Sequence, residues 1–590
     1  MNKISTVVIF SVVCFFTFTG NAQTVTGPLG ETFTYRVVAN SLSDPWEITY
    51  GPDNYLWVTE AKGYKVSRIN PATGSKTILV DLTSMRNFGT GGSPQGGLMG
   101  LALHPQLLTG KPYVYLAYVY SFSGCVTNDG GCFYKTKIVR YNYNSTAQIL
   151  TSPVTLVDTI PGSNDHNGGR LAIAPVNGIN YLFYGVGEMG AGQFNNAGRK
   201  NNAQDPNVYE GKILRFNLES DKDKGFDQWL PNDNPYITGG AGNGKNNGRQ
   251  SAVWSLGHRN PQGLGTGVFS GVTRLFSTEH GPFSDDELNI IERRSNYGHP
   301  LIVGMNDGNY NGLAAAASTN TTLSGMWQTS CPLITSENAN STSIGPEYKN
   351  PIKTFYPSTN TYLNTILTAV KNSNTATGYP NGNSETWESE AVSNVMHYSS
   401  YAIPGWNNSL LITTLKGGKL IRLKLSSSGD AVVGDTINYF KAANRYRDLA
   451  ISPDGNKIYL AVDSSLITSG PSANNPQVNT NRGSILEFTY VSNPPMARLL
   501  GFAATTYATS NNFYIYPNPA KDWLSVTSNS RHVGVMKYQL TDITGKLFFE
   551  GRGDGKKVRI NIRELSGGIY ILKVGSNEAK WLEIHKFIKQ

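Results

Sequence analysis

Residues 171–188 read LAIAPVNGINYLFYGVGE, which is two apolar runs joined by a Val-Asn-Gly turn. This pattern predicts an antiparallel β-hairpin, because β-rich runs flank turn-forming residues. The same outline returns at five other places along the chain, at residues 48–60, 101–120, 264–281, 396–418 and 449–463. We therefore predict an all-β fold in which six hairpins repeat one structural unit.

The composition agrees with several β-rich domains. A chain of 590 residues is too long for one ordinary hydrophobic core. It contains 32 Tyr, 23 Phe, 9 Trp and 63 Gly, while long helical periodicity is almost absent. The net charge is +9, but charged residues make up only 15% of the chain and no Lys/Arg run is present. Residues 513–590 hold 13 Lys and Arg against 7 Asp and Glu, so +6 of the charge lies there. We therefore predict no nucleic-acid partner.

The N-terminus has the pattern of a secretory signal peptide. Lys3 precedes an apolar run over residues 7–18, and the small residues Gly20-Asn21-Ala22 follow. The run is too short to span a bilayer, and a buried strand is less consistent with the basic terminus. We predict a signal peptide over residues 1–22 and no transmembrane segment in the mature protein. Its predicted location is secreted, or the outer-membrane surface, via the periplasm.

Export would place the cysteines in an oxidising compartment. Cys14 belongs to the predicted signal peptide. Cys125 and Cys132 flank the Gly-rich segment CVTNDGGC, which is compatible with a small disulfide-closed turn or, less well, with metal binding. Cys331 is then predicted to be a free, buried thiol.

After the signal peptide the chain divides into three parts. Residues 24–491 hold the six hairpins, residues 492–512 resemble a linker with Pro494 and Pro495, and residues 513–590 form a small β unit. Long loops are expected at residues 219–249 and 304–382. Long loops on a rigid β scaffold often carry functional sites.

Rare polar residues cluster at one end of the predicted hairpins. The residue before the first strand and the residue after the second strand of a hairpin lie at the same end. If the hairpins are arranged radially, these side chains converge on one opening. Gln95, His166, Arg259, Asn260, Arg445 and Arg447 precede first strands, and Glu188, Glu279, His280 and Lys416 follow second strands.

Two kinds of chemistry are suggested by this cluster. A neutral imidazole such as His166 can accept a proton, although a single His is usually structural or merely exposed. Glu188, at the far end of the same hairpin, could hold the other ring nitrogen and so favours the catalytic reading. The cations Arg259, Lys416, Arg445 and Arg447 would repel one another without an anion. We therefore predict a multiply negative ligand, and carboxylates suit the Arg side chains.

Residues 279–289, EHGPFSDDELN, could bind a hard cation. Gly281 and Pro282 would expose backbone carbonyls, and Asp285, Asp286 and Glu287 carry oxygen ligands of the kind that Ca²⁺ prefers. The alternative is an acidic loop in solvent. The chain has no EF-hand or zinc spacing, no GxSxG motif and no phosphate- or dinucleotide-binding loop in a usable context.

Eight segments in order resemble the soluble pyrroloquinoline quinone (PQQ)-dependent glucose and aldose sugar dehydrogenases, the glucose/sorbosone dehydrogenase family. The resemblance runs from about residue 42 to 490. It rests on PQGGLMGLALHP (94–105), DHNGGRLAIAP (165–175), GKILRFNL (211–218), LGHRNPQGL (256–264), EHGPFSDDELNII (279–291), NYGHP (296–300), TLKGGKLIRLKL (414–425) and NRYRDLAISPDG (444–455). It implies a six-bladed β-propeller of four-stranded antiparallel sheets.

The resemblance also implies an activity and its residues. The chain would oxidise the anomeric carbon of aldoses to the lactone, with His166 as general base and hydride transfer to Ca²⁺-bound PQQ. Gln95 and Glu188 match residues beside the base, and Arg259 matches the cation facing the quinone oxygen. An external electron acceptor is implied. The implied cofactor contacts are Arg259, Asn260, His280, Ser389, Lys416, Arg445 and Arg447. The implied calcium ligands are the carbonyls of Gly281 and Pro282 at the catalytic ion and Glu287, Tyr297, Asp307 and Glu337 at a structural ion.

Some positions depart from the glucose-oxidising branch. Glu188 stands where that branch has Asp, and His280 stands where it has Gln, so both are more like the aldose sugar branch. Ser389 takes the approximate place of a cofactor-contacting Thr, and no sugar-stacking Tyr is found near Trp387. Glucose is therefore not assumed as the substrate. The alternative function is a non-catalytic extracellular propeller that binds glycan or protein, which would not need His166.

The C-terminal part carries a second resemblance. YPNPAKDWLSV (516–526), YQLTDITGKLFFEG (538–551), LSGGIYILKV (565–574) and KFIKQ (586–590) resemble the C-terminal sorting domain of the type IX secretion system. That domain is a small β-sandwich, and the resemblance implies the secretion machinery as a partner. An ordinary substrate-binding β module is the alternative.

Overall fold

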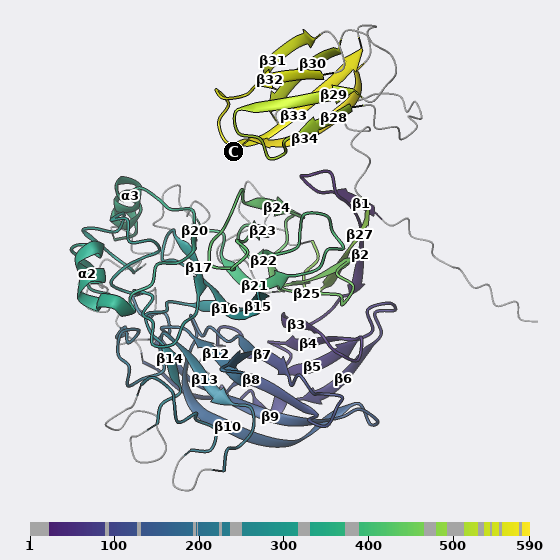
Figure 1. Cartoon of the computed structure of the whole chain (residues 1–590). Coiled ribbons are helices and arrows are strands. Elements are labelled where there is room, and N and C mark those ends of the chain that lie inside the picture. Colours follow the sequence, from purple (N-terminus) through teal and green to yellow (C-terminus); the bar gives the residue numbers. More distant parts are fainter. Residues whose placement is uncertain are drawn as a thin grey trace, which may run out of the picture. The chain divides into compact units, whose positions relative to one another are not determined.

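The computed structural model describes most of the chain and divides it into two compact units, Met1–Met496 and Ala497–Gln590 (Figure 1). The described residues are 23–88, 94–126, 131–192, 196, 199–222, 227–236, 250–316, 331–371, 389–464, 480–492, 513–528, 536–542, 546–553, 557–576 and 581–589. The predicted signal peptide with Cys14, residues 493–512 of the predicted linker, and Trp387 lie outside these ranges.

In its described residues, the first unit contains six antiparallel sheets of four or five strands. Four of them, in hydrogen-bonding order, are β3 (Pro45–Tyr50), β4 (Leu56–Glu60), β5 (Lys65–Ile69) and β6 (Lys76–Asp81); β7 (Leu98–Leu103), β8 (Tyr113–Val126), β9 (Gly131–Asn144) and β10 (Ile149–Ser163); β11 (Leu171–Val176), β12 (Ile179–Val186), β13 (Lys212–Asn217) and β14 (Val253–Ser255); and β15 (Pro261–Phe269), β16 (Val272–Glu279), β17 (Asp286–Ile290) and β20 (Lys353–Phe355).

The other two sheets complete the unit and join its two ends. They are β21 (Val392–Tyr398), β22 (Ser409–Thr414), β23 (Leu420–Lys424) and β24 (Ile437–Tyr439); and β25 (Tyr446–Ile451), β26 (Lys457–Val462), β27 (Ile485–Ser492), β2 (Thr32–Ala39) and β1 (Gln23–Thr26). In the last sheet β2 pairs with β27, so that Phe33 lies opposite Tyr490. The start and the end of this unit are therefore held in one sheet.

All six predicted hairpins are present as paired strands: β3–β4, β7–β8, β11–β12, β15–β16, β21–β22 and β25–β26. The first strand of each sheet contacts the first strand of the next, from β3 through β7, β11, β15 and β21 to β25 and back to β3. Figure 1 shows β3, β7, β15 and β21 near the centre of the unit and β6, β10 and β24 toward its periphery. The first strands thus form a closed ring.

Some middle strands carry continuous apolar runs because they are covered on both faces. Every residue of β4 and of β22 is buried. One core cluster, for example, joins Ala102 and Tyr115 of the second sheet to Leu171 and Leu182 of the third. Burial on both faces explains why runs such as Leu410-Leu411-Ile412 are continuous rather than alternating in polarity.

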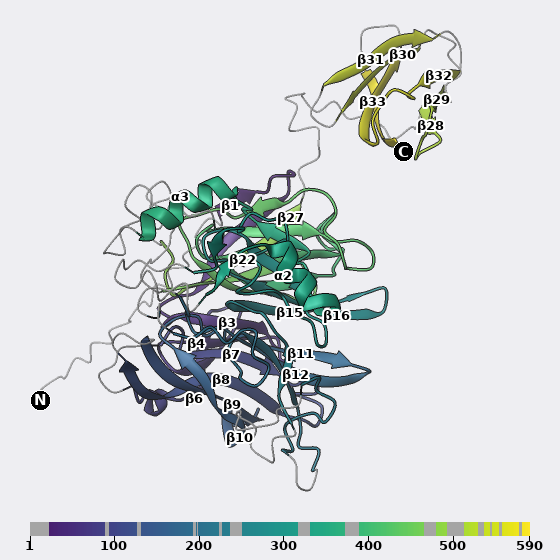
Figure 2. The same cartoon turned by 90° about the vertical axis from the view of Figure 1, so that its left-hand side faces the viewer.

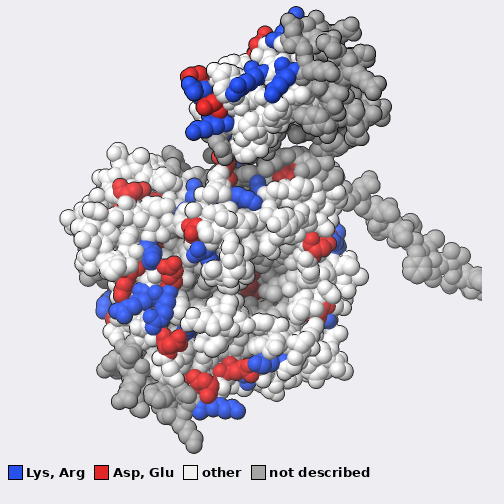
Figure 3. All heavy atoms as spheres, viewed as in Figure 1, with Lys and Arg blue, Asp and Glu red and all other residues white. Residues whose placement is uncertain are grey.

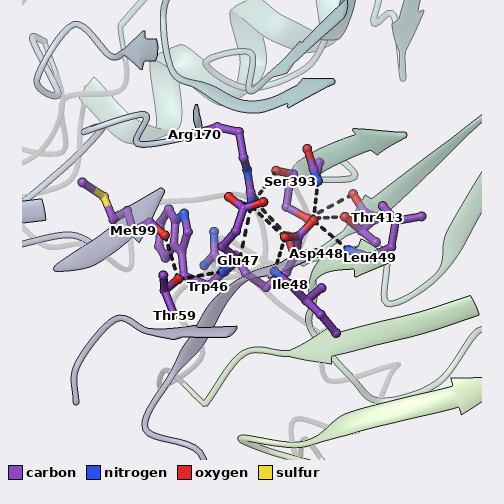
Figure 4. A network of polar contacts seen from close by, with 12 residues as sticks. Trp46, Glu47, Ile48, Thr59, Met99, Arg170, Ser393, Thr413, Asp448 and Leu449 are labelled. Carbon is purple, nitrogen blue, oxygen red and sulfur yellow. Dashed lines mark hydrogen bonds and ion pairs between the residues drawn. The ribbon is translucent and has the colours of Figure 1, made fainter. Parts of the chain in front are cut away.

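A buried arginine at the centre connects several sheets (Figure 4). Arg170 is fully buried just before β11, and its Nη1 lies 2.7 Å from Glu47 Oε2 and 2.8 Å from Asp448 Oδ2. Its Nε donates to the carbonyl of Gln262 at 3.1 Å and its Nη2 to that of Ser393 at 3.4 Å. These partners lie on β3, β25, β15 and β21, so one guanidinium joins four first strands to the start of β11.

The predicted long loop at residues 304–382 is partly regular. It contains β18 (Leu313–Ala314), β19 (Leu333–Ile334), α2 (Glu337–Ile344), the 3₁₀ turn Gly345–Glu347, and α3 (Asn360–Lys371). Ser336 caps α2 by accepting from the amide of Ala339, and Leu363 of α3 packs with Phe283 and Tyr310. Figure 1 shows the two helices at the periphery of the first unit, and in Figure 2, which views that side, α2 lies in front of the strands. Another 3₁₀ turn covers Thr83–Met85.

The second unit consists of two antiparallel sheets. One is β28 (Phe513–Tyr516), β29 (Trp523–Ser528) and β32 (Lys557–Asn561); the other is β31 (Leu547–Gly553), β30 (Met536–Asp542), β33 (Gly568–Ser576) and β34 (Trp581–Lys589). Both contribute to one core, which includes Leu524, Val526, Leu540, Leu572 and Phe587.

The cysteines follow the prediction where the structure describes them. Cys125 and Cys132 are direct cross-strand partners on β8 and β9, and Cys132 is disulfide-bonded. Cys331 is a free, buried thiol. Within the described ranges, no helix combines the length and the apolar character needed to cross a membrane. On the face of the first unit shown in Figure 3, acidic groups lie beside the basic ones among the described residues.

Candidate active site

The strand ends place the predicted site residues. Arg259 and Asn260 come directly before β15, and Arg445 comes directly before β25. Glu188 and Lys416 each follow the last residue of a second strand, β12 or β22, by two positions. These are the positions from which hairpin geometry directs residues to one side of the ring.

His166 forms a pair with Glu188. Its Nδ1 lies 2.7 Å from Glu188 Oε1, and the Glu188 side chain is fully buried. A carboxylate only accepts, so Nδ1 donates to Glu188, and in the neutral imidazole Nε2 is then the acceptor. Nε2 lies 3.5 Å from Asp165 Oδ1. Gly187 permits this arrangement, because a Cβ there would lie 2.0 Å from the carbonyl oxygen of His166.

The turn around His166 is held by residues that sequence reasoning missed. His166 itself has a φ of 52°, in the left-handed region where a non-Gly residue is strained. The Asn167 amide donates to Gln95 Oε1 at 3.0 Å, and Asn167 Nδ2 donates to the Gln95 carbonyl at 2.8 Å. Gln95 Nε2 reaches Asp165 Oδ1 at 3.3 Å. Gln95 therefore fixes the loop that carries the imidazole, and the signal for Asp165 and Asn167 was their place on either side of His166.

Arg259 joins the His166 pair to His280. Its carbonyl accepts from the amide of Glu188 at 2.8 Å, and its Nη1 donates to the carbonyl of His280 at 3.0 Å. His280 Nε2 lies 2.9 Å from the carbonyl of Val392 and therefore carries the proton. Burial, followed by the charges of Arg259, His166 and Arg447, holds the pKa of His280 well below its usual value. The charges of all three residues act on the imidazole of His280, so these residues lie near it.

The remaining predicted cofactor contacts are held by hydrogen bonds within the fold. Asn260 Oδ1 accepts from the Gly168 amide at 3.2 Å. Lys416 is buried, and its amide donates to the Glu390 carbonyl at 3.1 Å. Ser389 donates its hydroxyl to Asp286 Oδ2 at 2.8 Å. The Ser389 hydroxyl is thus committed to Asp286.

Arg447 and Arg445 share one buried carboxylate. Arg447 hydrogen-bonds to Asp463 and to Gln262 Oε1, and it lies over the ring of Trp46 at 4.1 Å. Arg445 Nε is 3.7 Å from Asp463 Oδ2. Two guanidinium groups on one carboxylate leave excess positive charge, which suits an anionic ligand.

Asp44 adds a second carboxyl group to this cluster. It is buried and hydrogen-bonds to Asp463. Burial and the charge of Asp463 raise the pKa of Asp44 to about 7. The folded protein therefore keeps a proton on Asp44 that the unfolded chain, with its ordinary carboxyl, loses near pH 4.

This shift predicts that Asp44→Asn changes the pH dependence of stability. Between about pH 4 and 7 the folded wild type binds more protons at this group, so its free energy of unfolding falls by up to about 1.4 kcal/mol per pH unit. Asn mimics the protonated carboxyl and removes this loss. From pH 4.5 to pH 8 the free energy of unfolding should therefore fall less in the variant than in the wild type. Urea denaturation of both proteins at both pH values measures this difference. A difference between the two proteins that does not change with pH would contradict the shared proton.

The sequence predicts that the acidic side chains of residues 279–289 could bind a hard cation, but two of them bond to other loops of the protein. Asp286 accepts from the Ser389 hydroxyl and from the amides of Gly281, Glu390 and Ala391. Asp285 hydrogen-bonds to Ser284 and Asn309. Both carboxylates therefore fasten loops together. The carbonyls of Gly281 and Pro282 accept no hydrogen bond from the described residues, which fits their predicted role as cation ligands.

The predicted structural calcium ligands are only partly suited to that role. Glu287 accepts from the Gly304 amide at 2.9 Å, and Glu337 accepts from the amides of Val303 and Gly308 at 3.0 and 2.8 Å. Glu287, Glu337 and Asp307 all raise the pKa of the Tyr348 hydroxyl, after burial, so the three carboxylates lie around one position. The Tyr297 hydroxyl is bonded to Ile290 and Glu292, which leaves only its carbonyl for a cation. In the described ranges, no three His, Cys, Asp or Glu side chains are arranged to hold a metal ion.

Comparison with known proteins identifies the class of this chain. The Glucose / Sorbosone dehydrogenase family profile matches residues 42–344 and 356–468, and the Secretion system C-terminal sorting domain profile matches residues 514–590. The chain belongs to the glucose/sorbosone dehydrogenase family and ends in a secretion system sorting domain.

Individual relatives agree with this assignment. Quinoprotein glucose dehydrogenase B of Acinetobacter calcoaceticus is 32% identical over 479 residues, which cover 78% of this chain and 91% of that protein. Aldose sugar dehydrogenase YliI of Escherichia coli K12 is 26% identical over 438 residues, which cover 74% of this chain and 91% of that protein. The crystal structure of the soluble aldose sugar dehydrogenase from Escherichia coli in the apo form aligns with a TM-score of 0.51 at 23% identity, over 78% of this chain and all of that one. The shared fold is a β-propeller.

Proposed function

We propose that this chain is an exported PQQ-dependent sugar dehydrogenase that oxidises the anomeric carbon of aldoses to the lactone. The observation that carries the proposal is the His166–Glu188 pair beside Arg259, His280 and Arg447. A binding module has no need of an imidazole that a buried carboxylate orients beside a group of cations. The sugar-oxidising relatives agree with this reading.

The fit of PQQ can be tested on the polar atoms of the site. Arg259 Nε, Arg447 Nε and Asn260 Nδ2 are buried and have no hydrogen-bond partner among the described residues. Buried donors without partners cost free energy, and a tricarboxylate with quinone oxygens would accept from them. The residues therefore fit the cofactor. Arg259, Asn260, Lys416, Arg445 and Arg447 would hold it, with Ca²⁺ on the carbonyls of Gly281 and Pro282.

The chain's own residues then divide the reaction. When bound, PQQ with its Ca²⁺ supplies the acceptor for two electrons and the hydrogen of the anomeric carbon. His166 Nε2 accepts the proton of the anomeric hydroxyl, while Glu188 orients the ring and stabilises the imidazolium that forms. Arg259 would supply positive charge toward the bound quinone. Gln95 holds the His166 loop, and an external electron acceptor would be needed to complete the turnover.

The proposal extends to the architecture and the location. Each of the six sheets of the first unit is one blade of a six-bladed propeller over residues 24–491. Residues 1–22 form a signal peptide, residues 492–512 a linker, and residues 513–590 a β-sandwich that directs export by the type IX machinery. The sorting domain supports a secreted or outer-membrane surface location. Glu188 and His280 are more like the aldose sugar branch of the family than the glucose-oxidising branch, so glucose is not assumed as the substrate.

The test is reconstitution of the full chain with PQQ and Ca²⁺, followed by dye reduction with a panel of mono- and oligosaccharides. We expect a sugar-dependent rate that needs both additions. Equilibrium titration with PQQ, followed by tryptophan fluorescence, should show tight uptake that depends on Ca²⁺. Uptake without any sugar-dependent rate would refute the dehydrogenase, and absence of both would favour a propeller that binds glycan or protein.

A further inference from the structure

Two glutamates lie directly opposite each other at the edge of the site. The register of β16 and β17 pairs Glu279 with Glu287, and both side chains are buried. Like charges at opposite positions of a sheet are destabilising. Asn289 separates them, because its Nδ2 donates to Glu279 Oε1 at 2.9 Å and to Glu287 Oε2 at 2.8 Å. One amide group therefore bridges two buried carboxylates.

The other side of Glu279 supports Arg259. Glu279 Oε2 accepts from the Arg259 amide at 2.8 Å, and Oε1 lies 3.0 Å from His258 Nδ1. His258 Nε2 is 2.8 Å from Ser255 Oγ, and the His258 ring stacks on Tyr297 with centroids 4.7 Å apart. Glu279 thus accepts hydrogen bonds from Arg259, His258 and Asn289. Only a carboxylate, which accepts at both oxygens, satisfies all three donors.

A catalytic reading of these residues fails on access. Ser255, His258 and Glu279 have the connectivity of a Ser–His–acid triad, but their exposures are 0%, 0% and 2%. No substrate reaches a hydroxyl that is buried in this way. Their role must be exerted through a neighbour, and the neighbour that borders the site is Arg259.

We propose that Glu279 and Asn289 are positioning residues for Arg259 and link it to the carboxylate of Glu287. The link is continuous, from the Arg259 amide to Glu279, from Glu279 to the Asn289 amide group, and from there to Glu287. This inference rests on the proposed function, in which Arg259 faces the quinone.

The test of positioning is Glu279→Gln in the full chain. A Gln side chain offers one acceptor oxygen and places an NH₂ group against N–H donors, so the Arg259 amide loses its partner. We expect PQQ to bind about 10- to 100-fold more weakly. Independently of PQQ, hydrogen exchange in peptides covering residues 256–260 should become at least about tenfold faster, as expected when a protecting bond is lost.

Glu31→Gln is the matched control. Glu31 is also a buried carboxylate, and it accepts from Trp406 Nε1 at 3.0 Å, Tyr439 Oη at 2.7 Å and the Leu29 amide at 3.0 Å. Its variant should lose stability but keep PQQ affinity and exchange at residues 256–260 close to those of the wild type. Equal behaviour of the two variants would overturn the positioning role.

The link to Glu287 has its own readout without PQQ. Asn289→Leu removes the amide group that donates to both carboxylates, so exchange at residues 256–260 should become faster in this variant as well. Exchange at the wild-type rate in Asn289→Leu would overturn the link. If the wild type fails to take up PQQ, the proposed function is wrong, whereas the exchange measurements still decide the positioning role.

Discussion

Replacing His166 with alanine is expected to slow sugar oxidation by the PQQ- and Ca²⁺-loaded protein by about 10²- to 10⁴-fold, the usual contribution of general acid–base catalysis. The physical reason is the pairing of Nδ1 with Glu188 at 2.7 Å, which leaves Nε2 as the proton acceptor. Without the imidazole, solvent must take the proton of the anomeric hydroxyl. The affinity for PQQ should change little, since His166 makes no part of the proposed cation cluster.

The measurement is the steady-state rate of dye reduction, with PQQ occupancy determined by titration of each variant. Added imidazole should restore part of the rate of His166→Ala, because a small base can occupy the vacated volume. Glu188→Gln should cause a smaller loss than His166→Ala, since it disturbs the orientation of the ring but keeps the base. A fully loaded His166→Ala variant that retains the wild-type rate would remove His166 from the mechanism.

The sequence was sufficient for the outline of the fold because the outline depends on local patterns. Each of the six hairpins has two apolar runs around a turn, and all six occur as paired strands. The convergence of His166, Arg259 and Arg447 was also predictable, because hairpin geometry fixes which strand ends share one side. The hydrogen bonds support this for His166 and Arg259, because Glu188 pairs with His166 at 2.7 Å and its amide donates to the Arg259 carbonyl at 2.8 Å.

The contacts that fix these side chains were not predictable, because they join residues far apart in the sequence. Asp44 hydrogen-bonds to Asp463, and Asn167 hydrogen-bonds to Gln95. No local sequence pattern predicts either pair. The carboxylate of Asp286 was read as a cation ligand from its acidic neighbours. In the structure it accepts bonds from residues 389–391, more than 100 positions away.

The contacts of Arg170 were also not predicted from the sequence. Arg170→Met is expected to lower the free energy of unfolding by about 3–5 kcal/mol. The methionine fills a similar volume but leaves Glu47 and Asp448 buried without a cation. Both carboxylates lie within 2.8 Å of Arg170 Nη1 in the wild type. The carbonyls of Gln262 and Ser393 lose a donor as well.

Urea denaturation of the full chain, followed by near-ultraviolet circular dichroism, measures this loss. Arg68→Met is the control, because Arg68 is also buried, at 8% exposure, and pairs at 2.7 Å with Asp53, which lies in the turn between β3 and β4 of its own sheet. It should cost less, since it unpairs one carboxylate instead of two and joins no other sheet.

The triple variant Arg170→Met, Glu47→Gln, Asp448→Asn separates charge from connection. If the loss arises from two unpaired carboxylates, neutralising them should restore more than half of it, because the desolvated charges are gone. If the triple variant is as unstable as Arg170→Met, the loss comes from the missing hydrogen bonds to the first strands. In that case Arg170 stabilises the protein by joining the first strands β3, β15, β21 and β25, on which the site depends. PQQ affinity should then fall in both variants, because Gln262 and Arg447, which contact Arg170 and each other, lose a common support.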